Sequence, residues 1–455
     1  MKIKFSLILS ITMLFSSCSS WIDSSINTDP NYPTDVPMAL LVGPIEANLA
    51  YVVGGDLSRD ACTWMQQIAG LQSQSSDIDV YNISESDVNN SWSFNLYSPG
   101  MVNTKILMSK SVAALSPHYT GIAKVLMAYH LGVTTDLWGD IPYSNALNGA
   151  NGQTKSTYDT QQTIYTTIFT LLNGAITDLN STTSATTPGS EDLIYSGDLT
   201  KWIKTAYALK ARYSLHLAKQ NPTTAYTDVL TAIANAYTSN GDDFKMIYGS
   251  ALNNSNPMYQ FTQQRSGYIG ANLKFVSMLT ATNDPRLTVY YTGSIGSPSG
   301  SSPNTSASGI GVNYASATSP VYLMSYAEQK FIEAEARFQT NDKPGAVLAY
   351  NAGLKASLDR EGVYDATWFA ANSITVGTIT LEKIINQKYL SSFLQIETWS
   401  DWRRTGYPTL SLATGAMTTQ IPRRLPYPSD ERLYNGANEP SPLPTITDRV
   451  WWDKQ

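Results

Sequence analysis

Few side chains of this 455-residue chain are spaced for catalysis or metal binding. Its three histidines, His118, His130 and His216, have no partner four residues away and no nearby carboxylate pattern, so they lack the signature of a histidine zinc site. Glu333 and Glu335 offer two carboxylates for a glycosidase. Residues two apart on a helix point to different faces, however, and cannot flank one bond.

Asp77 and Asp79 offer oxygen atoms for calcium or for sugar hydroxyls, but without the spacing of an EF-hand loop. The chain contains no G-x-S-x-G elbow, no phosphate-binding loop and no dinucleotide fingerprint. Two cysteines exclude a disulfide framework and a thiolate zinc site. We therefore expect neither an enzyme nor a bound metal or cofactor.

The composition points to neutral polar ligands. Charged residues make up 15% of the chain, and the net charge of −6 with a pI near 5.2 gives no basic field for nucleic acid. Hydrophobic residues make up 42%, enough for a buried core, and the chain has 28 tyrosines and 10 tryptophans.

The N-terminus has the pattern of a bacterial lipoprotein signal. Two lysines precede an uncharged apolar run over residues 5–15, which is followed by two serines and Cys18. Leucine usually stands three residues before the cysteine, where this chain has Phe15. We predict that Cys18 accepts the lipid; the alternative is an ordinary secretory signal with a chance cysteine.

The remaining chain reads as one domain on a tether. Residues 1–17 are predicted to be the signal peptide, residues 18–40 a polar, proline-punctuated lipidated tether, and residues 41–455 a single binding domain. No later segment offers eighteen consecutive apolar residues, so we expect a lipid anchor to hold the protein at the membrane.

Helical periodicity dominates this domain. Apolar residues over 323–338 fall on one helix face, with Glu333 and Arg337 paired four apart. A capped turn leads into a second helix that begins at Pro344. Such pairs are typical of tetratricopeptide-like units, so the predicted fold is all-α. Further helices are predicted at residues 121–135, 160–179, 201–219, 224–237 and 381–404, with long loops at 180–190 and 288–327.

A set of motifs along the whole chain resembles a known family. They are DLWGDIPY (136–143), YDTQ (158–161), GD (197–198), NDPRL (283–287), EAE (333–335), WSDWRRTGYP (399–408) and IPRRLPYP (421–428). Their order, the lipoprotein signal and the tryptophan-rich C-terminus are similar to those of the SusD/RagB-type (SusD-like) nutrient-binding lipoproteins of Bacteroidota outer membranes.

The resemblance implies four tetratricopeptide-like helix pairs with loops packed on one side. It also implies a lipid-anchored, surface-exposed protein of the outer membrane. That protein captures a nutrient, most often an oligo- or polysaccharide, and delivers it to a TonB-dependent transporter of the SusC type.

The resemblance also suggests a ligand site. In starch-binding members, a tryptophan and an asparagine three residues apart bind sugar, and Trp92 and Asn95 have this spacing, with Tyr97 close by. An aromatic ring can stack on the apolar face of a pyranose, while an amide pairs with its hydroxyls. Tyr81 and Trp64 could complete an arc. The alternative is that Trp92 and Tyr97 belong to the core.

Two other functions stay open: a surface glycan-degrading enzyme, for which no acid pair is found, and a peptide-binding or protein-adaptor lipoprotein without glycan affinity. Turnover of a glycan panel distinguishes the first. The absence of binding to every glycan of a test panel would favour the second.

Overall fold

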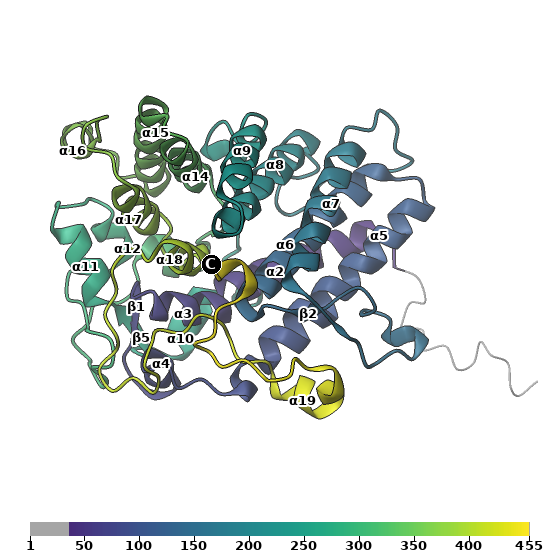
Figure 1. The fold of residues 1–455 in the computed structure, drawn as a ribbon, viewed down its shortest axis with the longest axis horizontal. Helices are drawn as coiled ribbons and strands as arrows, with labels where there is room; N and C mark the ends of the chain where they lie inside the picture. Colours follow the sequence, from purple (N-terminus) through teal and green to yellow (C-terminus); the bar gives the residue numbers. More distant parts are fainter. Residues whose placement is uncertain (1–35, 455) are drawn as a thin grey trace, which may run out of the picture.

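The computed structural model describes residues 36–454, which fold mainly into helices (Figure 1). The α-helices are α2 (Ala39–Gly54), α3 (Asp56–Trp64), α4 (Ser73–Asp79), α5 (Asn103–Ala113), α6 (Pro117–Trp138), α7 (Gln161–Leu179), α8 (Leu199–His216), α9 (Pro222–Ile233), α10 (Pro257–Gln264), α11 (Leu273–Thr280), α12 (Leu287–Tyr290), α13 (Val312–Ala315), α14 (Tyr326–Gln339), α15 (Lys343–Glu361), α16 (Ala366–Asn372), α17 (Leu381–Ser391), α18 (Glu397–Thr405) and α19 (Ser429–Asn435). A π-helix, Asn90–Val102, leads into α5.

Antiparallel helix pairs form a continuous row. Helices α5, α6, α7, α8 and α9 pack each on the next, and α14 and α15 extend the row from α9. Figure 1 shows this row running across the upper part of the molecule, from α5 at one end to α15 at the other. The arrangement confirms the predicted all-α class with tetratricopeptide-like helix pairs. Within residues 36–454, no helix is both long enough and apolar enough to span a bilayer.

Three small antiparallel sheets fasten the loops below the row. They pair β1 (Ile68–Gly70) with β5 (Ile269–Ala271), β2 (Ile141–Pro142) with β3 (Tyr158–Asp159), and β4 (Phe244–Met246) with β6 (Val321–Met324). Each joins segments that are separated in the sequence, such as Ile68 opposite Ala271.

Several predicted helix boundaries were wrong; the helix predicted over 224–237, for example, ends at Ile233. The helix predicted over 381–404 is broken into α17 and α18, because the buried side chain of Gln67 bonds the backbone of Ser392 and Leu394 at the break. Leu323, predicted in a helix, lies in strand β6. Helix α14 begins later because Ser325 caps it, accepting from the amide of Glu328 at 3.1 Å.

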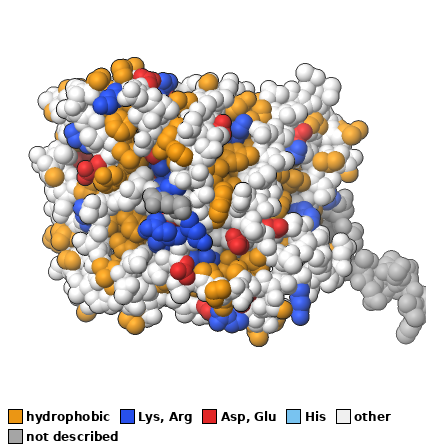
Figure 2. All heavy atoms as spheres, viewed as in Figure 1, with side chains coloured by type: hydrophobic (Ala, Val, Ile, Leu, Met, Phe, Trp, Pro, Cys, Tyr) orange, Lys and Arg blue, Asp and Glu red, His pale blue; other side chains and the backbone are white. Residues whose placement is uncertain are grey.

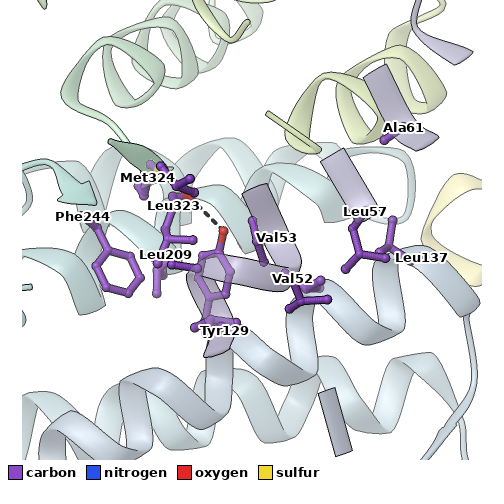
Figure 3. Packing of buried hydrophobic residues seen from close by; sticks show 14 of the residues in the cluster. Val52, Val53, Leu57, Ala61, Tyr129, Leu137, Leu209, Phe244, Leu323 and Met324 are labelled. Atoms are coloured by element: carbon purple, nitrogen blue, oxygen red, sulfur yellow. Dashed lines mark hydrogen bonds between the residues drawn. The ribbon is translucent and has the colours of Figure 1, made fainter. Parts of the chain in front are cut away.

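The largest buried cluster includes the junction between α2 and the helical row. Figure 3 shows Val52 and Val53 of α2 facing Tyr129 of α6, with Leu209 of α8 close by. The hydroxyl of Tyr129 donates to the carbonyl of Leu323 at 3.0 Å, which ties α6 to strand β6. Burial of each large apolar side chain stabilises this junction by about 2 kcal/mol.

Buried ion pairs connect α14 to α8 and to α18. Arg212 of α8 pairs with Glu328 of α14 at 2.7 Å, and Arg404 of α18 pairs with Glu335 of α14 at 2.6 Å. The predicted pair Glu333–Arg337 is present at 2.8 Å, and Asp401 pairs with Arg404 at 2.8 Å. Glu333 and Glu335 therefore have separate structural partners, as their positions on different helix faces predicted.

Two arginines of the extended segment 421–428 cap helix ends. Arg424 donates to the carbonyl of Trp138, the last residue of α6, and Arg423 donates to that of Arg403 in α18 at 2.8 Å. Positive charge at a helix C-terminus is favourable. These contacts hold the C-terminal segment across α6 and α18.

Candidate functional site

A polar groove of about 560 Å³ lies beside the segment that contains the predicted site. We use this name for the groove between α3, α4 and α10, beside the sheet β1–β5. These elements lie in the lower left part of Figure 1. Its lining is rich in carboxylate, amide and hydroxyl groups: Asp56, Arg59, Asp60, Thr63, Gln74, Ser75, Asp77, Ile78, Asn82, Ser84, Ser86, Asp87, Asn90, Phe261, Arg265 and Ile269. The volume lies within the range of ligand pockets.

Asp60 is the most unusual member of the polar groove. Its carboxylate accepts no hydrogen bond from any described residue, whereas neighbouring Asp56 pairs with Arg59. Burial and the charges of Asp56 and Asp87 raise the pKa of Asp60 to about 7, against the opposing charge of Arg59. An acceptor that the fold leaves unpaired is a ready partner for a ligand hydroxyl.

Two amides in the polar groove are also open to a ligand. The side chains of Gln74 and Asn90 are exposed and make no hydrogen bond to the described part of the chain. On the opposite wall, the guanidinium of Arg59 lies 4.0 Å from the ring centre of Phe261, with Arg265 at 5.6 Å. Such cation–π contacts attract both arginines to the ring of Phe261. The groove can therefore donate to and accept from a neutral, hydroxyl-rich molecule.

Trp92 lies in the core, at the base of a second recess of about 300 Å³. Only 2% of Trp92 is exposed. Its ring packs edge-on against Trp138 at 5.2 Å and lies 4.8 Å from Tyr97. The hydroxyl of Tyr97 donates to the carbonyl of Pro142 at 2.8 Å. Both residues line this second recess, but Trp92 offers no exposed face on which a sugar could stack, which favours its reading as a core residue.

Asn95 does not join Trp92 in the second recess. Its side-chain nitrogen donates to the backbone carbonyl of Asn90 at 3.0 Å. Its backbone carbonyl accepts from the side chain of Asn48 in α2 at 2.7 Å. The π-helix therefore presents Asn90 to the polar groove, and Trp92 and Tyr97 to the second recess.

Trp64 and Tyr81 are buried, at 0% and 3% exposure. Trp64 donates to the carbonyl of Ile78 at 3.0 Å, and the hydroxyl of Tyr81 accepts from the amide of Ala413 at 3.1 Å. Trp64 thereby holds α4, one wall of the polar groove, in position. The five predicted residues are thus not brought together in one site.

The two aspartates named in the sequence analysis, Asp77 and Asp79, also lie in different surroundings. Asp77 lines the polar groove, where it accepts from Asn82. Asp79 is turned inward to the backbone amide of Gly300. Within residues 36–454, no group of three or more histidines, cysteines or acids is placed to hold a metal. Burial raises the pKa of the Cys62 thiol to about 12, so this thiol is inert; Cys18 lies outside the described residues.

Sequence reasoning missed Asp60, Gln74 and Asn90. One signal was available, because Asp56 and Asp60 stand four apart on a short helix. Like charges at this spacing weaken a helix, so their presence indicates a role outside helix stability. Gln74 and Asn90 carry no such signal, since only the fold brings them together.

Figure 2 shows one face of the molecular surface. Uncharged side chains and backbone cover most of this face, apolar side chains form broad patches, and basic side chains gather near its centre, while acidic side chains are scattered.

Comparison with solved structures gives the same fold. A chitin-binding protein superposes with a TM-score of 0.80 at 24% identity, covering 92% of this chain and 100% of its own. A SusD/RagB family protein from Bacteroides thetaiotaomicron gives 0.76 at 26% identity, covering 92% and 99%. A chitin-binding SusD homologue from Flavobacterium johnsoniae gives 0.77 at 24% identity, covering 92% and 98%.

Sequence comparison shows the family directly. No curated protein matches the chain. The family model described as "starch-binding associating with outer membrane" matches residues 30–428, which is most of the chain. With the helical row and the fold shared with SusD homologues, this match shows that the protein is a member of the SusD-like family.

Proposed function

We propose that this protein is a cell-surface lipoprotein that captures an oligo- or polysaccharide in the polar groove. The observation that carries the proposal is the set of unpaired planar groups of Asp60, Gln74 and Asn90, open to one cavity. Carboxylate and amide groups match the paired donors and acceptors of neighbouring sugar hydroxyls. Family membership and the chitin-binding proteins of the same fold support a glycan.

The fold gives this groove a rigid frame. Helix α3 continues almost directly from the buried helix α2, and strand β1, which follows α3, pairs with β5, which follows α10. A preformed site loses little conformational entropy when a ligand binds. We therefore expect the groove to bind without rearrangement of the helical row.

A glycan panel tests the proposal. Native affinity gels containing starch, chitin-derived and other polysaccharides are run with the wild-type protein and with Asp60→Ala. Retardation of the wild type by at least one glycan, reduced in Asp60→Ala, is the expected result. A wild type retarded by none of them would contradict glycan capture.

Delivery to a transporter is the second part of the proposal. We expect the lipid on Cys18 to hold the protein at the outer membrane beside a TonB-dependent transporter of the SusC type, which receives the captured nutrient. The family description, starch-binding and outer-membrane-associated, supports this arrangement. Purification of the tagged protein from native membranes should yield a co-purifying barrel protein; its absence would argue against delivery.

A further inference from the structure

A further cavity large enough for a ligand lies on the helical row. It measures about 540 Å³, within the range of ligand pockets, and is lined by α7, α8, α9 and residues beside their ends. Helix α8 packs on both α7 and α9, and Figure 1 shows it between them in the upper part of the molecule. We call this cavity the α9 cleft. It shares no lining residue with the polar groove.

Helix α9 presents a ladder of hydrogen-bonding side chains to the α9 cleft. Its rungs follow one another at steps of three and four residues: Asn221, Thr224, Asp228, Thr231 and Asn235. All of them are exposed, and only Ala225 and Ala232 stand between them in the lining. Because a helix rises about 1.5 Å per residue, the rungs are about 5 Å apart over a length of about 20 Å.

The fold leaves several polar groups of the α9 cleft unpaired. The carboxylate of Asp228, the amide of Asn235 and, from α7, the amide of Asn173 make no hydrogen bond to the described part of the chain. The ammonium of Lys210 has no carboxylate partner among the described residues and lies 5.5 Å from the ring centre of Tyr207. These groups are available to a ligand.

The apolar part of the lining comes from α7 and α8. Phe169 of α7 and Tyr207 of α8 are half-buried, and neither ring packs on another ring of the described residues. An aromatic ring can stack on the apolar face of a sugar, and the amides and hydroxyls of the ladder can pair with sugar hydroxyls. The α9 cleft therefore offers both kinds of contact that a sugar ring needs.

The spacing of the ladder favours a sugar chain over a protein segment. One hexose of an extended polysaccharide spans nearly the same length as one step of the ladder. Side chains on one face of an extended peptide are about 7 Å apart and do not match rungs about 5 Å apart. A partner helix has a matching repeat, but helices pack through apolar faces, and every rung is polar.

The charge of the α9 cleft favours a neutral chain. Its lining contains one basic and one acidic side chain, Lys210 and Asp228. Their charges cancel, so neither a strongly acidic nor a strongly basic polymer is attracted.

We infer that the α9 cleft is a second glycan-binding site, which holds an extended neutral polysaccharide along α9. The inference rests on the proposed function for its class of ligand and adds a site to it. A chain of about five sugar residues would meet every rung of the ladder. A polysaccharide that reaches both the polar groove and the α9 cleft is held more tightly than by either site alone.

Affinity gels with matched threonine variants test the α9 cleft. Thr224→Ala/Thr231→Ala removes two rungs and is called the rung variant. Thr223→Ala/Thr227→Ala is its control, because these are exposed threonines of the same helix that do not line the cleft. Both variants and the wild type are run in native gels that contain soluble starch, glycol chitin or another polysaccharide of the same panel.

We expect the rung variant to bind the polysaccharide that retards the wild type about ten-fold more weakly, because two hydrogen bonds are lost. The control should be retarded like the wild type, and the melting temperatures of both should be unchanged, because all four threonines are exposed. Adding the rung substitutions to Gln74→Ala/Asn90→Ala should weaken binding further, because the two sites are separate.

Three outcomes would overturn the inference, and they have different meanings. If no polysaccharide retards the wild type, glycan capture itself is wrong, and the inference falls with it. If the wild type is retarded but the rung variant binds like its control, the proposed function stands and the α9 cleft is not a glycan site. If the rung variant keeps full retardation but loses the co-purifying barrel protein, the α9 cleft contacts a protein instead.

Discussion

The imidazole Nε2 of His216 lies 2.8 Å from a carboxylate oxygen of Glu397, and Nδ1 of the same ring lies 3.2 Å from Asp136. The ring is fully buried. Burial alone would lower the pKa of His216, but the two carboxylates outweigh it and raise the pKa to about 9. His216 is therefore a charged link between α6, α8 and α18 at neutral pH.

This link makes stability depend on pH. A histidine whose pKa is raised on folding stabilises the protein fully below its ordinary pKa of 6.5, and this contribution disappears as the pH rises through about 9. This rise in the pKa of His216 corresponds to about 3 kcal/mol in the free energy of unfolding. His216→Gln should lower the free energy of unfolding in urea strongly at pH 6, and the gap to wild type should narrow by pH 9.5.

His118 provides the control for that measurement. Its Nε2 faces only the carbonyl of Ser181, at 2.9 Å, without a carboxylate partner. His118→Gln, measured in parallel, reports the effect of removing an imidazole that has no carboxylate partner. A difference in unfolding free energy between His216→Gln and wild type that is the same at both pH values would contradict a charged His216.

We expect Trp92 to stabilise the fold as a core residue. Trp92→Ala removes a ring that is 2% exposed, so the cavity should cost about 3–5 kcal/mol in the free energy of unfolding. Phe94→Ala, two residues away and 65% exposed, should change it by less than about 0.5 kcal/mol. Thermal and urea melts of both variants check this. A Trp92→Ala protein as stable as wild type would return Trp92 to the candidate ligand residues.

Asp60 should show opposite effects on stability and binding. Its raised pKa means that folding favours the protonated form, which is populated at pH 4 and lost as the pH rises through about 7. Asp60→Asn should therefore raise the melting temperature at pH 8 but not at pH 4, while weakening glycan binding by about 1 kcal/mol.

Asp359→Asn is the matched control for Asp60→Asn. Asp359 makes an exposed pair with Lys355 on α15, and such pairs contribute little. Its loss should leave both the melting temperature and glycan binding unchanged at either pH. If Asp60→Asn destabilises the protein at pH 8, the carboxylate has a stabilising partner in solution.

Membrane attachment should depend on Cys18 alone. Cys18→Ala should move the protein to the soluble fraction, because the lipid supplies the whole attachment energy. Cys62→Ala, which alters a buried thiol, should leave the protein in the membrane. Fractionation is best done in cells lacking the proposed transporter. Membrane retention of Cys18→Ala there would exclude the lipid as the anchor.

The fold was largely predictable because its signals are local. Helical periodicity and the capped turn before Pro344 depend on consecutive residues, and the structure has the helix pair that they predict, with Asp342 as the cap of α15. The break between α17 and α18 was not predictable, since it depends on Gln67, more than 300 residues earlier.

The candidate site was harder to predict for the same reason. Trp92 and Asn95 share a helix and have the spacing of a binding pair, but packing against Trp138 turns the ring inward. The polar groove instead combines α3, α4 and α10, and no local pattern records that Asp60 and Gln74 face one cavity.

Calorimetric titration of the polar groove tests the central claim most directly. Starch- and chitin-derived oligosaccharides are titrated into the wild type, into Gln74→Ala/Asn90→Ala, and into Gln153→Ala/Thr154→Ala, which alters the second recess. We predict that at least one glycan binds the wild type. The groove variant should bind it about ten- to a hundred-fold more weakly at an unchanged melting temperature, and the second-recess variant should bind like the wild type. Wild-type affinity in the groove variant, or affinity lost only in the second-recess variant, would contradict the account.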